Sequence, residues 1–193
     1  ILYCGVGALG SHALYAGRDS AHALAAIDFD RVETKNLASQ WFVKQMVGKN
    51  KAAAMKMQLL NFYSIKLRDY TVRLSPDNAF TILAEYDLIV DAFDNAASRR
   101  LVQDFVRDRD VACIHAGLAA EAAYGTVRWD QDFVIDSEDV PGQPTCEGAG
   151  FLPMIQSVSA CLASAVQRFA EDGVMFNWNV APDKAEAFRA SSF

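Results

Sequence analysis

Short apolar runs alternate with longer mixed segments along most of the chain. The runs are typical of buried strands, and they are predicted at 1–4, 23–27, 70–74, 87–91 and 111–116. Helices are predicted between them, from about residue 8 and then over 47–63, 76–85 and 98–109. Strands that alternate with helices in this way indicate an α/β fold, with a doubly wound, mostly parallel sheet and helices on both faces.

The pattern changes after Gly117. The later elements are predicted to be extended segments at 122–129 and 133–135, a long loop at 136–150, a helix at 151–171 and a strand at 174–180, before a polar tail. We expect the extended segments to add antiparallel strands to the sheet. Long loops inside compact domains are usually functional or disordered, so 136–150 is a candidate functional segment.

Two helices differ in how their apolar residues are arranged. In the helix at 47–63, Ala53, Met57 and Leu60 are spaced for one apolar face. The helix at 151–171 is apolar around much of its circumference, at Leu152, Ile155, Val158, Leu162, Ala165, Val166 and Phe169. Because a single core-facing stripe needs fewer apolar positions, this helix predicts a two-fold homodimer.

A glycine-rich turn joins the first strand to the first helix. Gly5, Gly7 and Gly10 have the spacing G-x-G-x-x-G. The first glycine permits a tight turn, the second lets the backbone approach a phosphate, and the third lets helix and strand pack closely. The N-terminus of the helix also favours an anion there. A turn of this kind without a ligand is the alternative.

Asp28 ends the second apolar run, roughly 20 residues after the turn. In dinucleotide-binding folds a carboxylate at this distance meets a ribose hydroxyl. Together the glycine turn and Asp28 predict a nucleotide site.

Composition narrows the class of protein. A chain of 193 residues suits one domain, 1–193, and 52% hydrophobic with 22% charged residues excludes wholesale disorder. The net charge of −6 argues against binding to nucleic acid. No apolar run reaches the roughly 18 residues of a membrane span, so no membrane association is expected.

The cysteines indicate a reduced, cytoplasmic protein. Cys4, Cys113, Cys146 and Cys161 are scattered, without a C-x-x-C pair, so neither a zinc site nor a disulfide framework is predicted. Because the chain opens at Ile1 inside a strand and without a methionine, we also expect that residues preceding it are missing.

Further motifs follow the glycine turn in a specific order. They are Asp28-Phe29-Asp30-x-Val32-Glu33, Asn36-Leu37-x-x-Gln40, Val47-Gly48-x-x-Lys51, Asp91-x-x-Asp94-Asn95 with Ser98-Arg99, Gly117, Tyr124-Gly125-x-Val127, and Cys146-x-x-x-Gly150-x-x-Pro153. With this set the chain resembles the ThiF/MoeB/HesA family, the bacterial relatives of ubiquitin-activating enzymes, from residue 1 to roughly residue 170. An NAD-dependent oxidoreductase shares the glycine fingerprint but explains none of the later motifs.

The resemblance implies an enzyme with a Rossmann-like fold. Its activity is ATP-dependent adenylation of the C-terminal carboxylate of a small ubiquitin-like or sulfur-carrier protein that ends in Gly-Gly. ATP and Mg²⁺ are the expected cofactors, and a homodimer is expected from the family as well. The carrier and its pathway, sulfur transfer or bacterial ubiquitin-like conjugation, are left open by the sequence.

The resemblance also assigns roles to residues outside the glycine turn. Lys51 supplies a cation for the negative charge that develops at the α-phosphate, and Asp94 holds Mg²⁺ against phosphate oxygens. Asn36 and Gln40 offer neutral hydrogen bonds to the nucleotide, whose binding set also includes Asn95. The alternatives are a solvated lysine at a helix end for Lys51 and a helix N-cap for Asp94.

Cys146 is the candidate nucleophile. In thioester-forming members of the family, a cysteine stands a few residues before a glycine and the start of this helix. A thiolate near a helix N-terminus has a lowered pKa and attacks an acyl-adenylate readily, although the adjacent Glu147 opposes that effect. Because some members adenylate without a catalytic thiol, a structural role for Cys146 is equally open. Cys4, Cys113 and Cys161 lie on apolar elements and are predicted to be core residues.

Two departures from the family pattern leave other functions open. Ser39 stands where the family usually has an arginine, which removes one phosphate-binding cation, and the paired C-x-x-C zinc motifs are missing. The first departure favours a catalytically weakened binding subunit of a heteromeric activating complex. A tRNA-modifying dehydratase of the same fold is a third reading, against which the acidic net charge argues.

Overall fold

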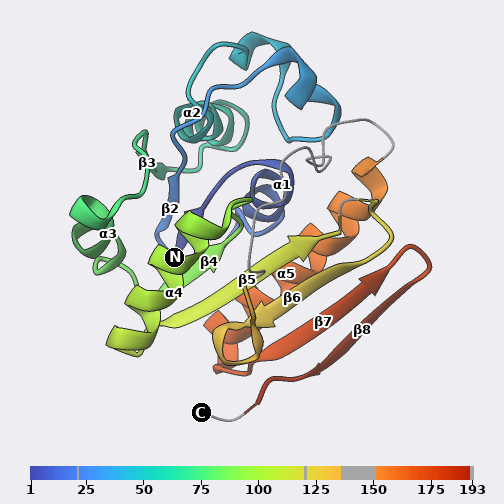
Figure 1. The fold of residues 1–193 in the computed structure, drawn as a ribbon. Coiled ribbons are helices and arrows are strands. Elements are labelled where there is room, and N and C mark those ends of the chain that lie inside the picture. The colour runs from blue at the N-terminus through green and yellow to red at the C-terminus, as the bar shows by residue number, and fades with distance from the viewer. Residues whose placement is uncertain (21, 120, 136–150, 192–193) are drawn as a thin grey trace.

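The computed structural model describes residues 1–20, 22–119, 121–135 and 151–191. Its strands form one sheet in the order β3-β2-β1-β4-β5-β6-β7-β8, with the N-terminus at its centre (Figure 1). The parallel strands are β1 (Leu2–Cys4), β2 (Leu24–Ile27), β3 (Leu67–Tyr70), β4 (Leu88–Asp91) and β5 (Ala112–Leu118). The antiparallel additions are β6 (Gly125–Trp129), β7 (Phe176–Ala181) and β8 (Lys184–Arg189). The predicted α/β sheet, with antiparallel strands toward the C-terminus, is therefore confirmed.

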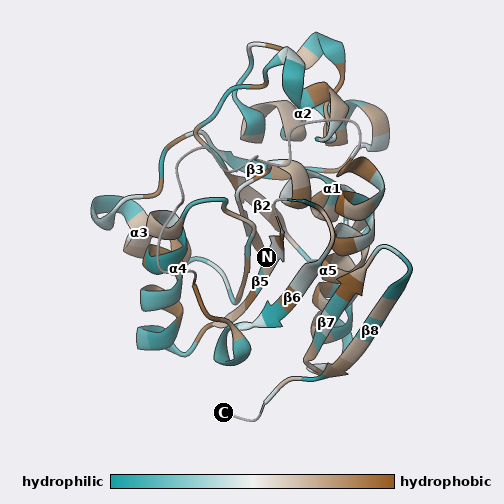
Figure 2. Ribbon diagram, turned by 45° about the vertical axis from the view of Figure 1, so that its right-hand side comes forward, coloured by the Kyte–Doolittle hydropathy of each residue, from teal (hydrophilic) through white to brown (hydrophobic). Residues whose placement is uncertain are grey.

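Helices cover both faces of the sheet because successive strand residues point to opposite sides. On one face, α1 (Ala8–Ala16), α2 (Lys51–Tyr63) and α5 (Leu152–Asp172) pack on strand residues such as Tyr3 and Ile114. On the other, α3 (Pro76–Leu83) and α4 (Ala96–Arg109) pack on residues such as Leu2 and Ile89. Figure 2 shows the mixed colouring of amphipathic helices on α3 and α4, whereas β5 is largely hydrophobic.

Three short 3-10 helices complete the described elements: η1 (Thr34–Ala38), η2 (Lys44–Met46) and η3 (Asp130–Asp132). The predicted start of α3 is confirmed, with Ser75 as N-cap and Pro76 in the first turn. The Ser75 backbone N–H donates to the Asn78 side chain at 2.9 Å, which closes the capping box.

The strand prediction is wrong at three places in the chain. The strand expected at 70–74 is β3, which ends where that segment begins, and 133–135 forms no strand. The polar tail instead contains β8, whose residues are all exposed. This edge strand is held by its backbone ladder with β7, and such a ladder needs no apolar side chains.

The predicted apolar face of α2 is also wrong. Met57 and Leu60 are 38% and 47% exposed, whereas Ala52, Met55 and Leu59 are buried. Each residue turns a helix by about 100°, so two apolar series one residue apart lie on different faces. The sequence of α2 contains both series, and packing against the sheet selects the second.

The apolar circumference of α5 is accounted for within the chain. Ile155, Val158 and Leu162 are fully buried, because the helix lies between α1 and the strands β5, β6 and β7 (Figure 1). The Ser159 hydroxyl donates to the Leu9 carbonyl oxygen at 3.0 Å and links the two helices. Exposed positions of α5 include Gln156 and Gln167. Among the described residues, no helix has both the length and the hydropathy to cross a membrane.

Candidate nucleotide site

The loops that follow β1, β2 and β4 meet at the carboxyl edge of the sheet. The Gly5 N–H donates to the Ile27 carbonyl oxygen at 2.9 Å, and the Ala92 N–H donates to the Cys4 carbonyl oxygen at 2.9 Å. The strand order reverses here, since β1 continues to β2 on one side and pairs with β4 on the other. Open α/β sheets bind ligands at such a switch point.

The three glycines of the turn have different surroundings. Gly5 has a φ of +86°, and a Cβ there would lie 3.0 Å from the Ala92 carbonyl oxygen. A Cβ on Gly10 would lie 1.9 Å from the Gly5 carbonyl oxygen, so the turn requires glycine at both positions. At Gly7, by contrast, a Cβ would meet no atom within 4 Å. The middle glycine therefore leaves open space at the N-terminus of α1, as an approaching phosphate would need.

Asp28 supports this turn directly. Its side chain accepts hydrogen bonds from the Val6 N–H and the Asp30 N–H, both at 2.9 Å. Burial raises the pKa of Asp28, although Lys51 and these two N–H groups act in the opposite direction. A carboxylate oxygen accepts more than one hydrogen bond, so these contacts are compatible with the ribose role expected from the sequence.

Lys51 lies beside the same loop. Its ammonium group is 3.1 Å from the Asp30 carboxylate, its backbone N–H donates to the Asp30 carbonyl oxygen at 2.8 Å, and the residue is only 8% exposed. These contacts exclude the alternative of a solvated lysine at a helix end. A buried cation close to Asp28 is instead present at the carboxyl end of β2.

The sequence left open whether Asp94 is the N-cap of α4. The Asn95 side chain accepts a hydrogen bond from the Ser98 N–H at 2.9 Å, so Asn95 is the N-cap of α4. Asp94 is not the cap, and its carboxylate is exposed, with Asn95 Nδ2 at 3.5 Å. Within the described ranges, no group of three or more His, Cys, Asp or Glu residues is placed to hold a metal ion.

The segment around η1 contributes buried polar atoms. Asn36 is buried, and its Oδ1 accepts a hydrogen bond from the Glu33 N–H at 2.8 Å. In the described part of the chain, Ser39 Oγ and Gln40 Oε1 are buried without a hydrogen-bond partner. Buried polar atoms without a partner are costly unless a ligand or water meets them. Both lie next to α1, where His12 Nε2 is 3.2 Å from the Ser39 carbonyl oxygen.

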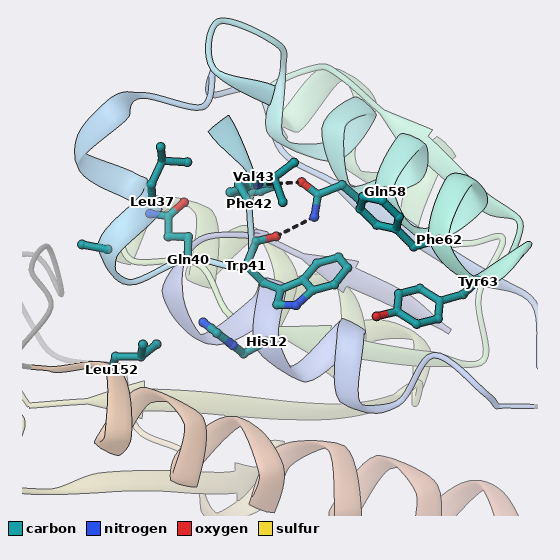
Figure 3. Close-up of a pocket in the computed structure, with 11 residues that line it drawn as sticks. His12, Leu37, Gln40, Trp41, Phe42, Val43, Gln58, Phe62, Tyr63 and Leu152 are labelled. Atoms are coloured by element: carbon teal, nitrogen blue, oxygen red, sulfur yellow. Dashed lines mark hydrogen bonds between the residues drawn. The ribbon is translucent and has the colours of Figure 1, made fainter. Parts of the chain in front are cut away.

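A pocket of about 270 Å³ adjoins this segment on the α2 side (Figure 3). Gln40 and His12 lie among its lining residues, together with the aromatic side chains of Trp41 and Phe62. The amide of Gln58 bonds to the Trp41 carbonyl oxygen and the Val43 N–H, both at 3.1 Å. The glycine turn is not among the residues that line this pocket, and its volume is below the roughly 300–1,000 Å³ of ligand pockets, so it is not the nucleotide site itself.

The candidate nucleophile, Cys146, lies outside the described residues.

The sequence reasoning missed a buried cluster around His115, which bonds to Asp91 at 2.8 Å and to Asp130 at 3.0 Å. A histidine inside the apolar run at 111–116 was the available signal, since a polar residue in a buried strand needs partners.

Strand order, glycine turn and switch-point site together define a Rossmann-like α/β protein. More narrowly, the chain belongs to the ThiF family, whose model matches residues 1–168. This confirms the resemblance that the motifs indicated.

The relatives that the chain matches include adenylyltransferases. Over 108 residues, 54% of this chain, it is 38% identical to the sulfur carrier protein adenylyltransferase of Thermus thermophilus and to the adenylyltransferase and sulfurtransferase UBA4 of Debaryomyces hansenii. It is 28% identical over 173 residues, 84% of this chain, to a probable molybdopterin-synthase adenylyltransferase of Porphyra purpurea. These matches cover 40%, 24% and 45% of the relatives, so the chain spans less than half of each.

Solved structures share the fold at low identity. MccB of E. coli, in a crystal structure with AMPCPP and MccA, superposes with a TM-score of 0.77 at 18% identity, over 100% of this chain and 64% of that one. PaaA superposes with a TM-score of 0.74 at 14% identity, again over 100% of this chain and 64% of the other. At these identities the likeness supports the fold alone.

Proposed function

We propose that this protein adenylates the C-terminal carboxylate of a small ubiquitin-like or sulfur-carrier protein with ATP. In that reaction a carboxylate oxygen attacks the α-phosphorus, and the bond to the leaving pyrophosphate breaks. The observation that carries the proposal is the meeting of the glycine turn, Asp28, Lys51 and the Asp94 loop at the switch point of a ThiF-family sheet.

The site residues have separate roles in this proposal. The turn of Gly5, Gly7 and Gly10 takes phosphate at the N-terminus of α1, and Asp28 meets the ribose. Lys51 neutralises charge that develops on the phosphates, and Asn36, Gln40 and Asn95 complete the nucleotide contacts. The buried Gln40 oxygen without a partner supports a ligand on that side.

Asp94 is the proposed ligand of Mg²⁺. Magnesium is usually held by one or two carboxylates together with substrate phosphates, so a single exposed carboxylate at this edge suffices. Bound there, the ion would neutralise charge on the phosphates.

Substitution of Asp94 tests the proposal. We expect Asp94→Ala to abolish carrier-dependent ATP–pyrophosphate exchange and to leave the fold intact, because Asn95 rather than Asp94 caps α4. Asp104→Ala removes an exposed carboxylate from α4 itself and is the matched control with normal exchange. Exchange that persists in Asp94→Ala would overturn the role of Asp94. Tight binding of NAD without binding of ATP by the unaltered protein would overturn the proposed function.

A second candidate function follows from Ser39. A serine with a buried, unpartnered Oγ stands where the family usually has a cation. The corresponding proposal is a binding subunit that presents a carrier protein to an active partner. In that case the protein would bind the carrier but would show no exchange on its own, and exchange would return when the active partner is added.

The proposal extends to the partner, the assembly and the compartment. The carrier is proposed to end in Gly-Gly, the reaction to take place in the cytoplasm, and the chain to form a single domain that associates as a homodimer. The dimer rests on the family resemblance, since most of the apolar side chains of α5 are buried within the chain. Cys146 is proposed to accept the acyl group as a thioester, with AMP as the leaving group.

A further inference from the structure

A row of alternating charges crosses the sheet beneath the β4–α4 loop. Asp91 Oδ2 is 3.7 Å from Arg99 Nη1 and 2.8 Å from His115 Nδ1. His115 Nε2 is 3.0 Å from Asp130 Oδ1, and Asp130 Oδ2 accepts a hydrogen bond from Arg107 Nε at 2.7 Å. The row joins β4, β5, η3 and α4, and the proposed nucleotide contacts use none of its members.

The middle of this row is closed to water. The side chains of His115 and Asp91 are fully buried. The Phe133 ring is stacked on the His115 ring at 4.1 Å, with an interplanar angle of 2°. Cys113 Sγ lies 3.4 Å from His115 Nε2, and Gln103 donates to Asp130 Oδ1 at 2.9 Å. These groups, with the two arginines, are the polar and charged neighbours of the ring.

The geometry is consistent with only one charge state of the ring. A neutral imidazole has a single N–H, so one of its nitrogens would present a lone pair to a carboxylate oxygen. Arg99 and Arg107 hold Asp91 and Asp130 as anions. The ring satisfies both carboxylates only when both of its nitrogens carry a proton.

The direction of the pKa shift of His115 agrees with this geometry. Burial lowers the pKa of His115, but the hydrogen bonds with Asp130, Asp91 and Cys113 oppose it, and the pKa lies well above 6.5. Burial raises the pKa of Cys113, so the sulfur stays a thiol at neutral pH.

The row ends at the candidate site. Asp91 is the last residue of β4, and its Oδ1 accepts a hydrogen bond from the Phe93 N–H at 3.1 Å. The next residue, Ala92, packs against Gly5 of the glycine turn. A carboxylate held between Arg99 and His115 thereby fixes the start of the loop that carries Asp94.

We propose that His115 is a positioning residue: as an imidazolium it clamps Asp91 and Asp130 and sets the 92–95 loop against the glycine turn. Its effect on nucleotide binding rests on the function proposed above. Its charge state and its effect on the loop do not, so they are measured without ATP.

The charge state is tested by ¹⁵N NMR of the full chain. We expect both ring nitrogens of His115 to be protonated at pH 8, with two ring N–H protons that exchange slowly. A ring with one N–H at that pH would overturn the proposal.

The positioning role is tested with His115→Gln, whose two N–H donors lie on a single nitrogen and cannot replace the contacts that the two ring nitrogens make to separate carboxylates. We expect hydrogen exchange of the Phe93 amide to become about tenfold faster and the Kd for Mg-ATP to rise by about tenfold. Effects of this size are common when a residue that orients a binding group is lost. Ile114→Val, on the same strand but facing the opposite core, is the control, with both values near those of the unaltered protein. Unchanged Phe93 exchange in folded His115→Gln would overturn the positioning role.

Asp130→Asn provides a second variant should His115→Gln fail to fold. Loss of one carboxylate charge makes the His115 ring titrate in an accessible range, so Phe93 exchange becomes pH-dependent between pH 6 and 8.5, roughly the range around an ordinary histidine. The Phe93 exchange rate in this variant is corrected for the intrinsic exchange rate. A corrected rate that does not change with pH would overturn the clamp. Absence of ATP binding by the unaltered protein, with both NMR results as expected, would overturn only the proposed function.

Discussion

At the scale of single residues, the glycine turn shows what a spacing motif can and cannot predict. The sequence predicted three different roles for Gly5, Gly7 and Gly10, and the structure gives each a different environment. Gly5 and Gly10 are needed for the fold, because backbone oxygens occupy the space of a side chain. Gly7 has room, so only a ligand would require glycine there.

This difference leads to a paired prediction. Gly10→Ala should destabilise the protein by about 1–3 kcal/mol or prevent folding, because its Cβ would overlap the Gly5 carbonyl oxygen. Gly7→Ala should change the free energy of unfolding by less than about 1 kcal/mol and yet weaken ATP binding. Urea unfolding and calorimetry on both variants make the comparison, and unchanged ATP affinity in Gly7→Ala would place the phosphate elsewhere.

Cys146 provides the second prediction at this scale. Incubation with ATP and the carrier should give a covalent adduct that reducing agent removes, because a free thiol exchanges with a thioester. Cys146→Ser should abolish this adduct while pyrophosphate release continues, since Lys51 and Asp94 serve the earlier step. Cys161→Ser, at a buried position of α5, is the control that keeps the adduct. A non-reducing gel without adduct on the unaltered protein, under conditions of fast pyrophosphate release, would make Cys146 structural.

At the scale of elements, the start of a helix and the order of strands and helices were predicted better than which helix face is buried or which strand forms the edge of the sheet. The Ser75–Pro76 start of α3 follows from capping rules, and the order of strands and helices follows from hydrophobic periodicity. The buried face of α2 and the strand β8 were missed, because tertiary packing selects between two apolar series and a backbone ladder stabilises a polar edge. The partners of His115 were missed for a related reason, since they come from β4 and η3, far apart in the sequence.

The N-terminus of α4 gives a prediction at this scale. Asn95→Ala should lower the free energy of unfolding by about 1 kcal/mol, because the Ser98 N–H loses its acceptor. Asp94→Ala should cost much less, since Asn95 rather than Asp94 is the N-cap whose side chain accepts the Ser98 N–H. Thermal unfolding of the two variants measures the contrast, and equal losses would show that Asp94 shares the cap.

At the scale of the whole molecule, the charged row predicts how stability depends on pH. Burial alone would raise the pKa of Asp130, but bonds from His115, Arg107 and Gln103 lower it to about 2, below its usual 3.8. The stability contributed by Asp130 is therefore present above about pH 3.8 and is lost as the pH falls toward 2. The raised pKa of His115 gives the opposite sign: its contribution is present below pH 6.5 and is lost only well above it.

Both contributions are thus present between about pH 4 and 6.5. In urea unfolding, the free energy of unfolding of the unaltered protein should exceed that of Asp130→Asn in this window. This difference should narrow as the pH falls from 4 toward 2. Asp104→Asn, which removes an exposed carboxylate of α4, should track the unaltered protein. A gap that is constant with pH would mean that Asp130 contributes through shape rather than charge.

The last prediction concerns assembly. A homodimer predicted from α5 would need an exposed apolar face, whereas Ile155, Val158 and Leu162 are fully buried within the chain. If the family resemblance is nevertheless a correct guide, another surface forms the contact, and substitutions on the exposed side of α5 should leave the dimer intact. Gln156→Glu and Gln167→Glu add charge there, since both positions are exposed. Light scattering should give the same dimer mass for the double variant and the unaltered protein at micromolar concentration. A monomer mass for both proteins would contradict the dimer. A monomer mass for the double variant alone would show that α5 forms the interface.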